Sequence, residues 1–254
     1  MLLDCHDLDA AVRSLAVASD RREQALIDAI ASVDLPGGTV SEDTETAVPR
    51  RAFEMLELTD EDFRFDGTCF FHGTRTLDPS SFRRHGILPL GRTVDQLWMD
   101  LHKLISEKIT LAEWRDHRAM VERGGGGHGG YLYRLKTTGL SFHGGPYAFL
   151  IRDHHLDRID GNHDYLATPE IVHDIARTCD FDLQQVFEDA AKPYIVKFRT
   201  AETTIHALHA AFWYVHAALR GEKSGWYSLY GHDCRNTVVS VEDVLDIAPV
   251  VPPA

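Results

Sequence analysis

The spacing of apolar residues changes along this chain, and that change constrains the fold more than any other feature. Apolar positions recur at helical intervals in three long segments, which are 7–33, 97–121 and 202–219. Short apolar runs typical of strands lie at 68–72, 193–200, 237–241 and 244–247. The two kinds of segment follow no regular strand–helix–strand rhythm. The sequence therefore predicts an α+β fold and not a doubly wound parallel sheet.

Local signals add further elements. A short helix is expected within 49–63. Thr168, Pro169 and Glu170 form a typical helix start, with a capping hydroxyl, a proline at the first position and an acid in the first turn. We expect that helix to continue to residue 191. The run 124–130 contains six glycines among seven residues, which predicts a flexible linker, followed by a strand-like segment at 131–135.

The chain has one clear internal boundary. Pro36, Gly37 and Gly38 end the first helical segment, and residues 39–48 are acidic and rich in threonine, as linkers often are. We therefore expect a helical N-terminal region at 1–48 and a main domain at 49–254.

The charge limits the classes of partner. Asp and Glu outnumber Lys and Arg by 39 to 26, which gives a formal charge of −13. This charge opposes nonspecific binding to a polyanion, because such binding depends on neutralising phosphates with basic side chains. A small anionic ligand needs only one or two placed arginines, so a nucleotide remains compatible with the composition.

The cysteines and the N-terminus bear on the compartment. Cys5, Cys69, Cys179 and Cys234 show no paired spacing, which is typical of free thiols in a reducing environment. No run approaches the roughly 20 apolar residues that span a bilayer, and the acidic N-terminus is unlike a basic signal peptide. We expect a cytoplasmic protein that does not bind a membrane.

One segment suggests a chemistry. The aromatic strand Thr68–His72 continues into Gly73 and Thr74, and a short helix with a Gly-Ile turn follows at 82–87. Over roughly 66–91 this arrangement resembles the ADP-ribosyltransferase superfamily, in the branch of the poly(ADP-ribose) polymerases, diphtheria-type toxins and tRNA 2′-phosphotransferases. The resemblance implies a split antiparallel sheet as the core. It also makes 92–140 a helical insertion with a Gly-rich loop, acting as a lid or as an acceptor-binding surface.

The resemblance implies roles for residues at the end of this strand. His72 would hydrogen-bond a hydroxyl of the nicotinamide-side ribose of NAD⁺, and the backbone of Gly73 would hold the nicotinamide amide. Thr74 and Arg75 would support the site. A guanidinium is suited to a pyrophosphate oxygen, so Arg75 is the expected phosphate contact.

The family also has a tyrosine that stacks on the nicotinamide ring. Tyr147 is the best match, because it follows a glycine at the start of an expected element. Tyr131 and Tyr133 are rivals, since both come directly after the Gly-rich run.

The chain departs from the family at its third signature, a glutamate on a late strand. The matching position holds Thr237, with Asp233 and Glu242 flanking it as possible substitutes. Glu170 lies at a suitable distance along the chain, but its place at a helix start is explained by the helix dipole. The departure argues against polymer elongation and leaves transfer of a single ADP-ribose or hydrolysis of NAD⁺.

The expected function is therefore mono-ADP-ribosylation of a macromolecular acceptor, with NAD⁺ as substrate and no metal. A bacterial toxin or defence effector paired with an antitoxin or immunity protein would have this form. A non-catalytic nucleotide- or protein-binding module is one alternative, supported by the absent glutamate. A metal-dependent hydrolase is another, because Asp153–Asp164 is rich in Asp and His.

Two other histidine-containing groups are weaker candidates. His206, His209 and His216 recur along one helical segment, where satisfied core histidines are the simpler explanation. His232 and Cys234 share one face if they lie on a strand, as a base and a thiol nucleophile would.

Overall fold

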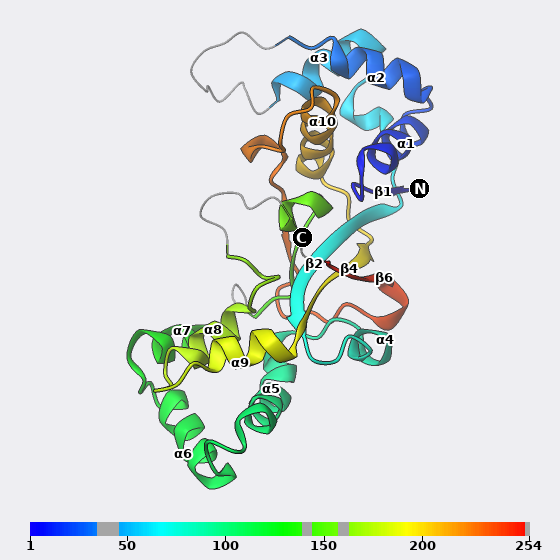
Figure 1. The fold of residues 1–254 in the computed structure, drawn as a ribbon. Coiled ribbons are helices and arrows are strands. Elements are labelled where there is room, and N and C mark those ends of the chain that lie inside the picture. The colour runs from blue at the N-terminus through cyan, green and yellow to red at the C-terminus, as the bar shows by residue number, and fades with distance from the viewer. Residues whose placement is uncertain (35–45, 139–143, 157–162, 252–254) are drawn as a thin grey trace. The chain divides into compact units, whose positions relative to one another are not determined.

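A long central strand, β2, organises the sheet. The computed structural model describes the chain except for residues 35–45, 139–143, 157–162 and 252–254. Its described part contains ten α-helices and an open six-stranded sheet, which confirms the expected α+β class (Figure 1). The strands are β1 (Leu2–Leu3), β2 (Gly67–Thr76), β3 (Tyr147–Phe149), β4 (Lys192–Thr200), β5 (Gly231–Asp233) and β6 (Val244–Pro249). Their order is β5-β3-β2-β4-β6, with β1 also pairing with β2.

The helices fall between these strands. They are α1 (Leu8–Ala18), α2 (Glu23–Ala31), α3 (Ala47–Leu56), α4 (Ser81–His85), α5 (Leu90–Ile105), α6 (Leu111–Glu122), α7 (Gly127–Thr137), α8 (Glu170–Ala176), α9 (Leu183–Ala190) and α10 (Ile205–Leu219). None of the helices in the described residues is long and apolar enough to cross a membrane.

Strand β2 confirms the expected aromatic strand and extends it to Thr76. It runs parallel to β1, with Leu2 opposite Gly67, and antiparallel to β3, with Phe71 opposite Phe149. Residues 67–71 are buried, as expected for a central strand covered on both faces.

The chain divides into two compact units. The first contains the described residues of Met1–Phe71, Ala148–Gly161 and Lys197–His232, and the second those of His72–Tyr147, Asn162–Val196 and Asp233–Ala254. This division differs from the expected boundary between 48 and 49. The N-terminal helices α1 and α2 are part of the first unit because they pack against α3 and α10. Within that unit the rings of Phe53 and Phe212 meet edge to face, 4.9 Å apart.

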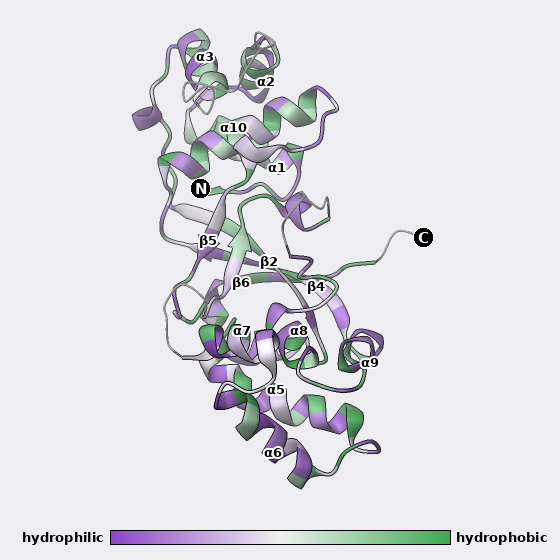
Figure 2. Cartoon of the chain, turned by 90° about the vertical axis from the view of Figure 1, so that its left-hand side faces the viewer, coloured by the Kyte–Doolittle hydropathy of each residue, from purple (hydrophilic) through white to green (hydrophobic). Residues whose placement is uncertain are grey.

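Helices α5 to α9 share a hydrophobic core in the second unit. At its centre Trp98 donates a hydrogen bond to the Tyr133 hydroxyl over 3.0 Å, and Trp114 donates to the backbone carbonyl of Trp98 over 2.8 Å. Figure 2 shows hydrophobic and hydrophilic residues alternating along α5 and α6, as expected for helices with one buried face. The insertion 92–140 thus has its own buried aromatic centre.

Two expected helices are each interrupted. The segment 97–121 is two helices, because Thr110 begins α6 with a reciprocal capping box to Glu113. The expected helix from 170 to 191 is α8 followed by α9, and Asp182 caps the start of α9. In each case a residue that stabilises a helix start lies inside the apolar pattern that suggested one continuous helix.

The glycine run was expected to be a linker followed by a strand, and both expectations were wrong. Helix α7 begins at Gly127 and includes the segment 131–135. A Cβ atom on Gly129 would lie 2.6 Å from the carbonyl oxygen of Asp174, and one on Gly130 would lie 1.8 Å from that of Gly125. These glycines therefore allow a close approach of backbones, and tertiary packing outweighs their low helix propensity.

The late strand expected at 237–241 is also absent. Arg235 and Asn236 both adopt left-handed backbone conformations, and Thr237 N–H donates to the carbonyl of Cys234 over 2.8 Å. A turn therefore occupies this position, and only Val239 forms an isolated bridge, to Ile87. The following strand, expected at 244–247, is confirmed as part of β6.

Gly86 controls the turn after α4 and offers a stability test. Its φ is +73°, and an added Cβ would lie 2.0 Å from the carbonyl oxygen of Val239. We expect Gly86→Ala to destabilise the protein by about 3 kcal/mol, since it adds a clash to a strained backbone conformation. Urea denaturation followed by circular dichroism measures this loss.

The control for this variant is Gly91→Ala. Gly91 lies in α5 with no atom within 4 Å of the added Cβ. We expect a gain of about 0.5–1 kcal/mol there, because alanine favours the helix. Equal effects at the two glycines would contradict the role assigned to Gly86.

Candidate functional site

A cleft of about 1050 Å³ lies within the second unit. Five segments form most of its walls, namely the end of β2, the α4 turn, one face of α5, the residues 144–147 before and at the start of β3, and the beginning of α8. The lining also includes Lys136, Tyr165, Phe187 and Asp233. Helix α5 contributes residues at helical spacing, which are Leu90, Thr93, Gln96, Leu97, Asp100 and Lys103. The cleft contains all four residues that the resemblance placed at the end of the strand, His72, Gly73, Thr74 and Arg75.

The imidazole of His72 has a defined orientation. Its Nδ1 lies 2.7 Å from the carbonyl oxygen of Tyr147. A carbonyl only accepts hydrogen bonds, so Nδ1 carries the proton of the neutral ring and Nε2 carries the lone pair. Burial lowers the pKa of His72 from its ordinary value, which favours this neutral form. The ring therefore offers a hydrogen-bond acceptor in the cleft wall.

Two tyrosines lie beside each other in the cleft. The ring centroids of Tyr147 and Tyr165 are 6.4 Å apart, and the ring planes differ by 29°. The rivals of Tyr147 lie elsewhere, because Tyr133 is buried in the helical core and Tyr131 is an exposed residue of α7 outside the cleft lining. Burial, followed by the charge of Asp233, raises the pKa of the Tyr147 phenol. Tyr165 was not singled out from the sequence.

Glu170 connects this aromatic pair to a charged network. The Tyr165 hydroxyl donates to Glu170 over 3.2 Å, and Lys136 Nζ lies 3.2 Å from the other carboxylate oxygen. Lys136 also pairs with the buried Asp174 over 2.5 Å. The helix dipole accounts for a glutamate at the start of α8, but the side chain also belongs to the cleft wall. No local pattern around Glu170 indicates that second role.

Thr237, which holds the position of the family glutamate, and the two acids that flank it lie in different surroundings. Asp233 lines the cleft at the end of β5, where the next residue, Cys234, donates its N–H to the carbonyl of Pro146 over 2.9 Å. Thr237 is exposed in the turn after β5 and does not line the cleft. Glu242 is also exposed and outside the lining.

Arg75 lines the cleft, but its donors are directed at backbone carbonyls. They reach Leu166 O over 3.0 Å, Glu188 O over 2.9 Å and Ala191 O over 3.2 Å. A contact with pyrophosphate would require the guanidinium to leave these carbonyls. The expected phosphate role of Arg75 therefore does not fit its surroundings.

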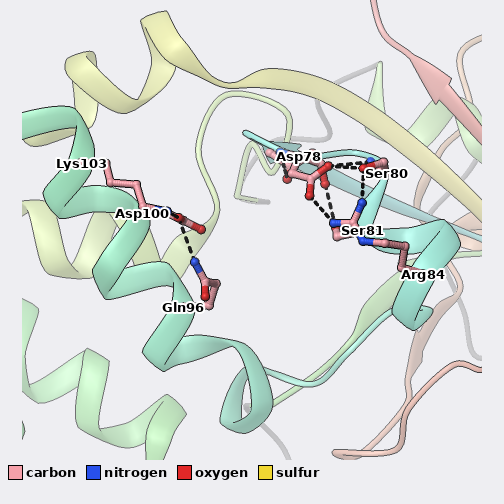
Figure 3. Close-up of polar contacts among 8 residues, drawn as sticks. Asp78, Ser80, Ser81, Arg84, Gln96, Asp100 and Lys103 are labelled. Carbon is pink, nitrogen blue, oxygen red and sulfur yellow. Dashed lines mark hydrogen bonds and ion pairs between the residues drawn. The ribbon is translucent and has the colours of Figure 1, made fainter.

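The remaining charges of the cleft are mostly paired. Figure 3 shows Asp78, Ser80 and Arg84 together on one wall, and Gln96, Asp100 and Lys103 together along α5. Arg84 pairs with Asp78 over 2.5 Å, and Lys103 with Asp100 over 2.6 Å. Arg92, at the start of α5, is an exposed cation whose side chain contacts no carboxylate among the residues that the structure describes. It is the cation best placed to meet an anionic ligand.

The other histidine and cysteine groups have structural surroundings. His216 is buried with Nε2 3.0 Å from Val33 O, and the ring of His232 stacks on Phe70 at 4.5 Å. Burial raises the pKa of the Cys234 thiol to about 11, which disfavours a thiolate nucleophile.

Half of the Asp/His loop at Asp153–Asp164 lies outside the described part, because 157–162 are not described. Within the described residues, no three His, Cys, Asp or Glu side chains are grouped closely enough to hold a metal ion. His155 is buried, with Nε2 2.8 Å from the backbone carbonyl oxygen of Phe71.

No model of a known protein family matches this chain, and no curated protein or solved structure matches it either.

Proposed function

We propose that the cleft binds NAD⁺, breaks the bond between nicotinamide and its ribose, and transfers a single ADP-ribose to a macromolecular acceptor or to water. One observation carries this proposal. An imidazole with a fixed acceptor nitrogen and a pair of nearly parallel tyrosine rings line the same cleft.

The tyrosine pair suits a flat heterocycle. A ring held between two others needs about 7 Å between them, since each stacking contact takes about 3.5 Å. The ring centroids of Tyr147 and Tyr165 are 6.4 Å apart, which is slightly less than this distance. In the proposed complex Tyr147, which is 39% exposed, rotates to open the pair, and nicotinamide stacks between the two rings.

The polar groups suit the ribose. The Nε2 lone pair of His72 accepts a hydrogen bond from a ribose hydroxyl and orients the sugar. When the glycosidic bond breaks, its electron pair leaves with nicotinamide, and positive charge develops on the sugar ring. The carboxylate of Glu170 stabilises that charge, and the nucleophile forms the new bond and loses its proton to solvent. Asp233 is the alternative carboxylate from the same cleft.

The pyrophosphate is assigned to Arg92. Its guanidinium is exposed, lines the cleft and has no carboxylate partner among the described residues. A charge-assisted contact of this kind lets a strongly acidic chain hold an anionic dinucleotide. A role in toxicity or defence, with an antitoxin or immunity protein, is a compatible setting for such an enzyme.

The proposal is tested with labelled NAD⁺, with and without cell protein. We expect release of nicotinamide, and we expect Tyr147→Leu to raise the KM for NAD⁺ about fivefold through the loss of about 1 kcal/mol of stacking. Tyr131→Leu is the matched control, because Tyr131 is 61% exposed and lies outside the cleft lining. Absence of both NAD⁺ binding and nicotinamide release in the wild-type protein would overturn the proposal.

The pH dependence follows from His72. Protonation of Nε2 removes the acceptor, so kcat/KM falls as the pH drops through the pKa of His72. Because burial holds that pKa below 6.5, we expect half-maximal kcat/KM below pH 6.5. The raised pKa of Tyr147 keeps its phenol neutral, so no alkaline loss from this group is expected below pH 10. An acid limb centred above pH 6.5 is inconsistent with His72 as the acceptor.

A further inference from the structure

Arg75 joins two segments that are far apart in the sequence. Its Nη1 donates to the carbonyl of Leu166, and its Nη2 and Nε donate to the carbonyls of Glu188 and Ala191. A weaker contact reaches Ala167 O at 3.5 Å. The side chain therefore ties the loop before α8 to the C-terminal end of α9.

The site is well matched to arginine. The last carbonyls of a helix have no partner within the helix and carry partial negative charge, so a cation at the end of α9 is stabilised there. A planar guanidinium has five N–H donors in fixed directions and serves carbonyls on two segments at once. A lysine ammonium keeps the charge but does not span the same set.

The loop that Arg75 holds carries the second cleft tyrosine. Leu166 directly follows Tyr165, whose ring faces Tyr147 and whose hydroxyl donates to Glu170. A second tether acts on the same loop, because the Thr168 hydroxyl donates to the side chain of Glu188. Both tethers fix the loop to α9.

We propose that Arg75 is a positioning residue that sets the place of Tyr165. Through Tyr165 it sets the distance between the two tyrosine rings and the orientation of Glu170. This inference rests on the proposed function for its effect on catalysis. The tethering itself is independent of the ligand. In this proposal Arg75 acts by holding the loop that carries Tyr165, and it does not contact a phosphate.

A double-mutant cycle tests the proposal. We expect Arg75→Lys to raise the KM for NAD⁺ about tenfold with a smaller change in kcat, and Tyr165→Leu to do the same. If Arg75 acts through Tyr165, the double variant has the KM of Tyr165→Leu alone. Multiplication of the two effects would show that Arg75 acts separately and would overturn the proposal.

Hydrogen exchange supplies a readout without substrate. We expect Arg75→Lys to speed exchange of the amides of 165–168 at least tenfold, while the buried amides of Phe70 and Phe71 keep their protection. Thr168→Val breaks the second tether and is expected to speed exchange in the same loop, which covers the case in which Arg75→Lys fails to fold. Unchanged exchange at 165–168 in a folded Arg75→Lys refutes the tether. If the wild type does not cleave NAD⁺, the proposed function fails, and the exchange result still decides on Arg75.

Discussion

Replacing His72 with alanine is expected to lower kcat/KM for NAD⁺ cleavage by about 10²–10³-fold, because it removes an oriented acceptor from the reacting sugar. The tautomer of His72 is fixed, so Nε2 is the nitrogen that accepts the hydrogen bond from the ribose. Nδ1 is occupied by the Tyr147 carbonyl, so no rotation of the ring presents Nε2 differently without breaking that bond. Nicotinamide release under single-turnover conditions measures the effect on the chemical step.

A catalytic effect of His72→Ala must be distinguished from an effect on folding. Loss of the bond to the Tyr147 carbonyl costs about 1 kcal/mol, which leaves the folded state populated at 25 °C. Circular dichroism and the melting temperature check this. His128→Ala is the control, since His128 is exposed on α7 and outside the cleft lining. Turnover in His72→Ala equal to that of His128→Ala would remove His72 from the mechanism.

The sequence alone located one wall of this cleft. The strand signal in Thr68–His72 is strong because consecutive aromatic and small apolar residues suit a buried strand, and the strand is present as part of β2. The turn at Gly86 was visible from its glycine, and Tyr147 from the glycine and proline before it. Each of these signals is local, so a single sequence reveals it.

The opposite wall could not be foreseen, because it depends on packing between distant segments. The helix dipole alone explained Glu170 in the sequence, and only the fold brings its side chain to Tyr165 and Lys136. Arg75 looked like a phosphate ligand beside His72. Successive residues of a strand point to opposite faces, so residues three apart do as well, and the Arg75 side chain contacts the end of α9 instead. A chemical role inferred from neighbours in sequence takes no account of such tertiary partners.

The secondary structure of the helical insertion 92–140 was also only partly predictable from the sequence. An apolar repeat over 97–121 predicted one helix, but the Thr110–Glu113 capping box divides it. That signal was present in the sequence and was outweighed by the repeat. The glycines of α7 carry no such signal, because their helical state depends on close contact with Asp174 and Gly125.

The second large effect is expected at Glu170. We expect Glu170→Gln to lower kcat by about 10²–10³-fold with little change in KM, because a neutral amide no longer stabilises the charge that develops on the sugar. Glutamine keeps an oxygen that accepts the Tyr165 hydroxyl, so the aromatic pair is retained. Lys136 keeps its bond to Asp174, which limits the structural effect. Steady-state nicotinamide release over a range of NAD⁺ concentrations gives kcat and KM separately.

Asp233→Asn provides the decisive comparison. Both carboxylates line the cleft, and Asp233 was one of the two acids that the sequence offered in place of the absent family glutamate. A loss of kcat confined to Glu170→Gln assigns the charge stabilisation to α8, because the two variants remove the same charge, one beside Tyr165 and one near Tyr147. A loss confined to Asp233→Asn assigns it to β5 and contradicts the role given to Glu170. Asp100→Asn, on the α5 wall, controls for the general field of the cleft, since it removes one negative charge without touching either tyrosine.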